Sequence, residues 1–258
     1  MLGWEWGNSD SEKIYHDPET RKNSISFRGN LHRLSEELIK NNEKEKAEKI
    51  LDLSLEKMPV DYFGFYSLLE PYISTYYKLG KFDKGDALFS SLSKKYEQKL
   101  NYYSNLSFSR TSNFSIYTFA EKIITDTERF RSLIESSLES KDNKLKSKAI
   151  EIFVSKTEFV KEIYGNYDYF TLLIPLLEDA YKYNKSTFSR NLYSNISKEI
   201  KQRLELFSSM ESDNQLNYIE NIASNLYEFR NILKIVEKYD TDQEFITVSY
   251  THLRAHET

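Results

Sequence analysis

Apolar side chains recur at intervals of three and four residues through the first hundred residues of the chain. This spacing constrains the fold most, because it puts the apolar side chains on one face of an α-helix. The 258 residues include only 7 Gly and 4 Pro, so turn residues are scarce. Helices joined by short loops need few turn residues, whereas sheets need more. We therefore predict an all-α fold.

Four consecutive segments carry such stripes. In chain order, the stripes are Phe27, Leu31, Leu34 and Leu38; Ala47, Ile50, Leu51, Ser54 and Met58; Leu69, Tyr72, Ile73 and Tyr76; and Leu88, Phe89, Leu92, Tyr96, Leu100 and Tyr103. Pro59 is expected to end the second helix and Gly80 the third. Neighbouring helices joined by a short polar turn form a helical hairpin.

The two hairpins resemble tetratricopeptide repeats, whose period is about 34 residues. Asn42 and Gly80 stand at the turn between the two helices of a repeat, and Pro59 stands at the end. Ala47 and Gly85 stand where the paired helices approach too closely for a larger side chain. The resemblance implies tetratricopeptide-like helical hairpins stacked as a short solenoid.

A longer internal repeat is visible when the chain is shifted by 104 residues, which aligns residues 66–106 with 170–210 without a gap. Among the residues that recur are Leu69, Pro71, Tyr77, Lys78 and Leu88, matched by Leu173, Pro175, Tyr181, Lys182 and Leu192. We predict an extended lead-in over 1–26, a first helical unit over 27–145, a second, related unit over 146–246 and a non-native tail over 247–258.

The tail is set apart because residues 248–258 resemble the translation of a transposase-type sequencing-library adapter. Segments of this kind are excluded from reasoning about the fold. The native chain is then expected to continue differently after Ile246 or Thr247. His252 and His256, spaced as a helical metal pair would be, are set aside for the same reason.

Composition excludes several functions. The net charge of −4 and the mixed charge pattern give no basic footprint for nucleic acid. The absence of Cys excludes disulfides, thiolate metal sites and Cys nucleophiles. The longest apolar run, 170–177, is too short to span a bilayer, so we expect a soluble chain. No phosphate loop, nucleophile elbow or zinc motif is present, and we predict no catalytic residue, metal or cofactor.

In a tetratricopeptide frame, the inner positions of the first helix of each hairpin are candidates for binding a partner. These concave-face candidates are His32, Glu36, Lys40, Glu70, Ser74 and Lys78, with Glu178 and Lys182 in the second unit. Their charges suit a polar peptide segment or a terminal carboxylate. The alternative is that they are ordinary exposed charges on helix surfaces.

The first hundred residues also resemble a more specific family. The residues that carry this resemblance are Trp6-Gly7-Asn8, Asp17, Arg21, Phe27-Arg28, Leu31, Arg33-Leu34, Lys46-Ala47, Leu51-Asp52, Met58-Pro59, Tyr76-Tyr77 and Gly80. They are similar to the C-terminal extracytoplasmic region of bacterial protein-O-mannosyltransferase-like membrane glycosyltransferases. The resemblance covers about residues 4–106, is looser over 198–240 and fails between them. It implies a membrane-embedded parent, with the catalytic residues in its membrane part.

Three functions follow as hypotheses. The first is a non-catalytic domain of such a membrane protein, on the periplasmic side, that holds an acceptor protein or a partner. The second is a free-standing tetratricopeptide-like adaptor, which would be cytoplasmic. The third is a glycan-binding module that uses surface tyrosines, of which the chain has 20 in all. The sugar, the acceptor and the oligomeric state are not specified by the sequence.

Overall fold

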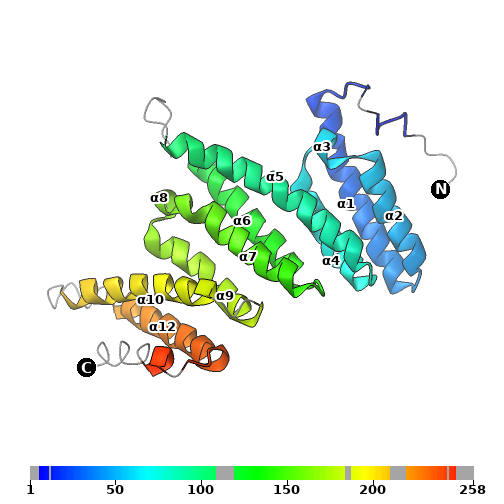
Figure 1. The fold of residues 1–258 in the computed structure, drawn as a ribbon. Helices are drawn as coiled ribbons and strands as arrows, with labels where there is room; N and C mark the ends of the chain where they lie inside the picture. The colour runs from blue at the N-terminus through cyan, green and yellow to red at the C-terminus, as the bar shows by residue number, and fades with distance from the viewer. Residues whose placement is uncertain are drawn as a thin grey trace. The chain divides into compact units, whose positions relative to one another are not determined.

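The computed structural model describes residues 6–11, 13–108, 119–183, 187–209, 219–242 and 244–247. This described part is all-α and 85% helical, and adjacent helices pack in pairs (Figure 1). None of the described helices is long and apolar enough to cross a membrane. The predicted tail over 248–258, with His252 and His256, lies outside the described residues.

Contacts divide the chain into two compact units, which differ from the ranges predicted. The first unit is 1–100 with 125–145, and the second is 101–124 with 146–258. The division falls inside two helices, α5 (Phe82–Phe108) and α6 (Ala120–Ser137), so 101–124 belongs to the second unit. A related helical unit over 146–246 therefore stays a prediction. Each unit is described by itself.

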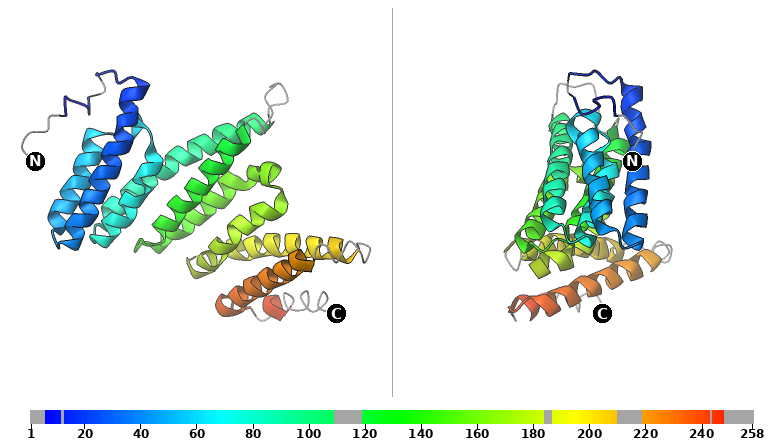
Figure 2. Two further views of the ribbon diagram at one scale, coloured as in Figure 1. Left: turned by 180° about the vertical axis from the view of Figure 1, so that it is seen from behind. Right: turned by 90° about the vertical axis from the view of Figure 1, so that its right-hand side faces the viewer.

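The first unit begins with an antiparallel hairpin of α1 (Pro18–Lys40) and α2 (Lys44–Lys57), visible from behind in Figure 2. The predicted lead-in over 1–26 is too long, since α1 starts at Pro18. Asp17 caps this helix by accepting hydrogen bonds from the backbone N–H groups of Glu19 and Thr20. Pro at the first helical position fits a helix start, because its missing N–H would be unpaired there anyway.

The buried face of α1 is polar, unlike the predicted apolar stripe. Ser24, Arg28 and Ser35 are its buried residues, whereas Leu34 is 42% exposed. The two serines fit there because each hydroxyl donates to a backbone carbonyl of its own helix, three residues earlier. Phe27, Leu31 and Leu38 are partly buried, so the face that packs most closely is rotated about the helix axis from the face that the apolar spacing indicated.

Arg28 is fully buried and its guanidinium binds the chain that follows α2. Nη2 donates to the carbonyl of Met58 at 2.7 Å, and Nη1 donates to the carbonyls of Gly64 at 2.5 Å and Phe65 at 3.3 Å. Gly64 and Phe65 both have positive φ angles, of 69° and 46°. The cation thus satisfies the carbonyls of Met58 and Gly64 at a strained turn, and it shares the carbonyl of Phe65 with the backbone N–H of Leu68.

A second hairpin follows this turn. The short helices α3 (Val60–Phe63) and η1 (Tyr66–Leu69) lead into α4 (Glu70–Lys78), and α5 (Phe82–Phe108) follows. The predicted stripes of α2, α4 and α5 are all buried, which confirms these three helices and their inner faces. Pro59 and Gly80 mark the ends as predicted.

The turns of the two hairpins have the same geometry, as their tetratricopeptide-like spacing suggests. Asn42 (φ 62°) and Gly80 (φ 76°) both adopt the left-handed conformation. In each turn, the next N–H donates to a carbonyl five residues earlier: Glu43 to Leu38 and Lys81 to Tyr76, both at 2.8 Å. This closure is the Schellman motif, which caps the carbonyls at a helix end.

Small residues allow the helices of each hairpin to approach. Ala47 is fully buried in α2, and Gly85 is buried in α5 against the ring of Tyr77. A Cβ atom at position 85 would lie 2.8 Å from Cδ1 of Tyr77, so only Gly fits without movement. The predicted close-approach positions are therefore occupied as the repeat pattern requires.

The rest of the first unit is 125–145, which holds most of α6 (Ala120–Ser137), and this helix packs on α5. The rings of Tyr96 and Phe130 stack at 5.4 Å. Lys99 pairs with the buried carboxylate of Asp126 at 2.7 Å. Both contacts join the two helices inside the unit.

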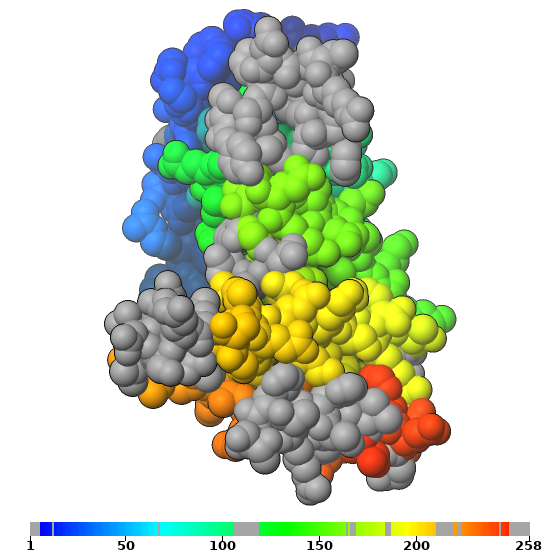
Figure 3. Space-filling model, turned by 90° about the vertical axis from the view of Figure 1, so that its left-hand side faces the viewer, coloured from blue at the N-terminus to red at the C-terminus, as the bar shows by residue number. Residues whose placement is uncertain are grey.

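The second unit contains most of α7 (Asn143–Thr157), then η3 (Glu158–Val160), α8 (Lys161–Tyr164), α9 (Asn166–Tyr183), α10 (Thr187–Ser208) and α12 (Ile219–Tyr239). Helices α9, α10 and α12 pack against one another. The segment after α12, in red in Figure 3, lies against α10 in yellow. There Arg190 forms ion pairs with Asp240 at 2.6 Å and Asp242 at 3.1 Å.

The shift of 104 residues relates helix pairs in the two units. It carries α4 and α5 onto α9 and α10, and Tyr77 and Tyr181 are both buried. Position 85 corresponds to Ser189, which is fully buried and again small. The recurring residues therefore occupy equivalent places in two helix pairs.

Candidate functional site

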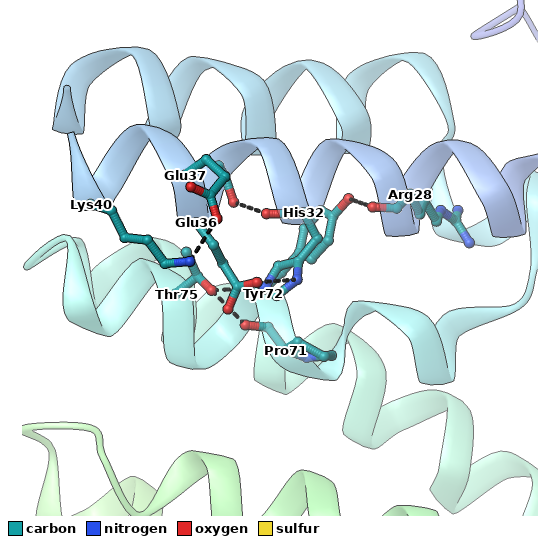
Figure 4. Close-up of polar contacts among 9 residues, drawn as sticks. Arg28, His32, Glu36, Glu37, Lys40, Pro71, Tyr72 and Thr75 are labelled. Atoms are coloured by element: carbon teal, nitrogen blue, oxygen red, sulfur yellow. Dashed lines mark hydrogen bonds and ion pairs between the residues drawn. The ribbon is translucent and has the colours of Figure 1, made fainter. Parts of the chain in front are cut away.

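Figure 4 shows three of the predicted binding residues, His32, Glu36 and Lys40, on α1 where that helix packs beside α4. His32 is at the centre. Its ring stacks on Tyr72 at 5.4 Å with an interplanar angle of 16°. The Tyr72 hydroxyl in turn donates to the carbonyl of Arg28 at 2.8 Å. His32 is therefore held between the helices, and its side chain is only 16% exposed.

The hydrogen bonds of His32 define its tautomer. Thr75 donates its hydroxyl hydrogen to the carbonyl of Pro71 at 2.9 Å, so Nε2 of His32 donates to the Thr75 oxygen at 3.0 Å. Nδ1 lies 3.8 Å from the carboxylate of Glu36. Burial lowers the pKa of His32, Glu36 and the backbone of Pro71 oppose this shift, and Lys78 adds a small further lowering. The imidazole is thus neutral at pH 7.

Three charged candidates of the first unit have exposed side chains. The side chain of Glu36 is 46% exposed, and Lys78 is exposed on α4. Lys40 is 69% exposed and pairs with Glu37 at 2.6 Å, which raises its pKa. Exposed pairs of this kind are weak and exchange easily for other partners. Glu36, Lys40 and Lys78 are therefore the members of the set that can meet a ligand, and we call them the α1–α4 face.

Two further candidates of the first unit have internal partners. Glu70 is buried, 9% exposed, and accepts a hydrogen bond from the Tyr96 hydroxyl at 2.6 Å. Burial raises its pKa, and this hydrogen bond opposes the rise. Ser74 donates to Glu139 at 2.8 Å. Glu70 is thus not a surface charge, because α4 turns it towards α5.

The candidates of the second unit lie along α9. Glu178 accepts from the ammonium of Lys238 and the hydroxyl of Tyr239, both at 2.9 Å, and these bonds lower its pKa. Lys182 is exposed and lies over the ring of Tyr183 at 5.0 Å. Glu178 thus links α9 to α12, and Lys182 remains open to solvent.

The surface tyrosines are few in the described part of the chain. Tyr15, Tyr102 and Tyr227 are more than half exposed, and they lie apart in the sequence, before α1, in α5 and in α12 respectively. Most of the other tyrosines that the structure describes lie in the helix interfaces. A stacking platform built from tyrosines is therefore not formed by these residues.

The apolar spacing of the sequence did not indicate one feature of the first unit, a pocket at the N-terminal end of α1. It lies between that helix, the start of the chain and the turn after α2. The consecutive residues Asp17 and Pro18 are typical of a helix start, and they could have indicated the start of α1 beside this pocket. Among the described residues, no group of three or more His, Asp or Glu is placed to hold a metal ion.

Comparisons with known proteins give no assignment for these features. No protein-family model, no curated protein and no solved structure matches the chain.

Proposed function

We propose that the chain is a non-catalytic, tetratricopeptide-like scaffold that binds a polar peptide segment of another protein on the α1–α4 face. The observation that carries the proposal is the packing of α1 beside α4, which brings exposed Glu36 of α1 and exposed Lys78 of α4 to the helix pair that holds the neutral His32. Neighbouring first helices are the surface that such repeats offer to peptides. Opposite charges on one rigid face suit the amide groups and mixed charges of a peptide.

A selection from a displayed random-peptide library tests this proposal. The full chain would be compared with the charge-swapped double variant Glu36→Lys with Lys78→Glu. Peptides selected on the wild type should bind the variant at least about tenfold more weakly, a difference readily resolved by titration. The swap keeps the net charge and changes only which charge stands where.

The matched control is Glu19→Lys with Lys22→Glu. These residues form an exposed pair at 2.6 Å on the same helix, away from His32. Selected peptides should bind this control as they bind the wild type. If no peptide is selected, or if both double variants bind equally well, the α1–α4 face is not the binding site.

The setting that we propose for this scaffold is a membrane glycosyltransferase-like protein, in which it holds an acceptor protein or a partner subunit outside the inner membrane. The resemblance of residues 4–106 to that family supports this setting. The alternative is a free-standing adaptor. Sequencing the source reading frame separates the two: about ten apolar spans directly before Trp4 support the first, and a stop codon there supports the second.

A further inference from the structure

The segment before α1 folds back over that helix and leaves a pocket of about 220 Å³. Its walls are aromatic: the rings of Trp6 and Phe27 lie 6.2 Å apart at 57°, and the ring of His16 lies 5.2 Å from that of Phe63. Buried Met58 and Phe63 belong to the same lining. A cavity of about 150 Å³ holds benzene, so this one holds a six-membered ring with substituents.

Hydrogen bonds fix the outer wall of the pocket. The Ser9 hydroxyl donates to the carbonyl of Lys57 at 2.8 Å. The backbone N–H of His16 donates to the Tyr62 hydroxyl at 3.0 Å, and that hydroxyl donates to the carbonyl of Ile14. Because these bonds tie the segment to α2 and α3, the pocket is largely formed before any ligand arrives, which lowers the entropic cost of binding.

The three hydroxyl groups of the lining have no hydrogen left to donate to a ligand. Ser9, Thr20 and Ser24 each donate their hydroxyl hydrogen elsewhere, to Lys57, Asp17 and Arg21 respectively. Each oxygen keeps lone pairs that can accept. Nε2 of His16 is buried and has no hydrogen-bond partner among the described residues. A buried polar atom of this kind is costly unless something binds it.

We propose that this pocket binds one neutral pyranose ring of a saccharide. A sugar ring brings several hydroxyl donors to the three hydroxyl oxygens, whereas a phenol or an indole brings only one donor. Its C–H faces pack by dispersion against Trp6 and Phe27. The described lining holds no Asp, Glu, Lys or Arg, so an ionic ligand finds no counter-charge there.

This pocket is separate from the peptide-binding proposal. It lies at the N-terminal end of α1, whereas His32, Glu36 and Lys40 lie in the C-terminal half of the same helix. It also differs from a glycan surface made of exposed tyrosines, since none of its lining residues is Tyr. Either proposal can therefore fail without the other.

The test is a titration of the full chain with methyl glucopyranoside, methyl galactopyranoside and methyl mannopyranoside. The readout is the indole N–H signal of Trp6 in NMR spectra, assigned with Trp6→Phe. We expect at least one of these glycosides to give a saturable shift with a Kd in the millimolar range. No shift with any of the three overturns the proposal.

Two variants and one control place the binding in the pocket. Asn23 is exposed at the pocket rim, and Asn23→Phe fills the space, so Kd should rise at least about tenfold. The neighbouring residue Lys22 is exposed but does not line the pocket, so Lys22→Phe should leave Kd within about twofold. Thr20→Val removes one oxygen and keeps the shape, and it should raise Kd about threefold even if Asn23→Phe disturbs the fold.

An unchanged Kd in both pocket variants would overturn the assignment to this site. Binding of 4-methylphenol in place of the glycosides would also overturn it, because the pocket would then recognise an aromatic side chain of a protein.

Discussion

Replacing Gly85 with Ala should destabilise the first unit, although Ala is ordinarily the better helix residue. In an exposed helix interior, Gly→Ala stabilises by about 1 kcal/mol. Here the new Cβ would lie within 3.0 Å of three atoms of the Tyr77 ring. That ring is 5% exposed, stacks on Phe82 at 5.5 Å and donates its hydroxyl to Asp86 at 2.7 Å, so it has little room to move.

The expected size follows from these opposing effects. Overpacking a well-filled interface costs about 1–3 kcal/mol. After the helix-propensity gain is subtracted, Gly85→Ala should lower the free energy of unfolding by about 1–2 kcal/mol. Gly29 of α1 is the control, since a Cβ there meets nothing within 4 Å. Gly29→Ala should therefore raise stability by about 0.5–1 kcal/mol.

Urea unfolding followed by tryptophan fluorescence reports on the first structural unit, where Gly85 and Gly29 lie, because both tryptophans of the sequence precede residue 100. A double-mutant cycle with Tyr77→Ala gives the decisive result. In that background, the ring is gone and Gly85→Ala should become stabilising by about 1 kcal/mol. If Gly85→Ala stabilises the wild type as much as Gly29→Ala does, the close approach of α4 and α5 is refuted.

Three further predictions concern buried polar groups of the first unit. Arg28→Met should lower the free energy of unfolding by about 3 kcal/mol or more, because the carbonyls of Met58 and Gly64 lose their donor. A loss below about 1 kcal/mol, measured by urea unfolding, would contradict this. Burial raises the pKa of Glu70 above its ordinary value of 4.5, so its contribution to stability is complete below pH 4.5 and is lost as pH rises through the folded-state pKa. Urea unfolding at a series of pH values should show the stability of Glu70→Gln increasing relative to the wild type as pH rises through this range. A difference in free energy of unfolding that does not change with pH would refute this prediction. The pKa of His32 is lowered from 6.5, so its contribution to stability is present above pH 6.5 and is lost as pH falls through the folded-state pKa. An NMR titration of the imidazole should give a pKa below 6.5, and a still lower pKa in Glu36→Gln. A pKa at or above 6.5 would contradict the burial of the ring.

The helices with apolar interfaces could be predicted from the sequence. The stripes of α2, α4 and α5 are buried as expected, and their ends at Pro59 and Gly80 follow from backbone chemistry. Both effects are local, so the order of residues is enough to reveal them.

Helix α1 shows why the same reasoning fails elsewhere. Its buried face holds Ser24, Arg28 and Ser35, which a search for apolar spacing treats as solvent-exposed. What makes Arg28 a core residue is a turn more than thirty residues later, whose carbonyls need a donor. A contact between such distant parts of the chain cannot be predicted from the local spacing of residues.

The candidate site shows the same limit. The spacing brought His32, Glu36 and Lys78 to one surface, but it could not tell that His32 stacks on Tyr72 or that Glu70 is buried beside Tyr96. Both depend on the rotation of α4 about its axis, which is set by how α4 packs against α1 and α5.

The buried guanidinium of Arg28 has a consequence for how the protein responds to ionic strength. Arg28 is fully buried, and the groups it contacts are neutral peptide carbonyls. Dissolved ions screen exposed charge pairs, such as Lys84 with Asp52, but they do not reach a cation enclosed by peptide dipoles. Salt will therefore weaken the ion pairs between helix surfaces but will leave the hydrogen bonds of Arg28 between α1 and the turn after α2 unchanged.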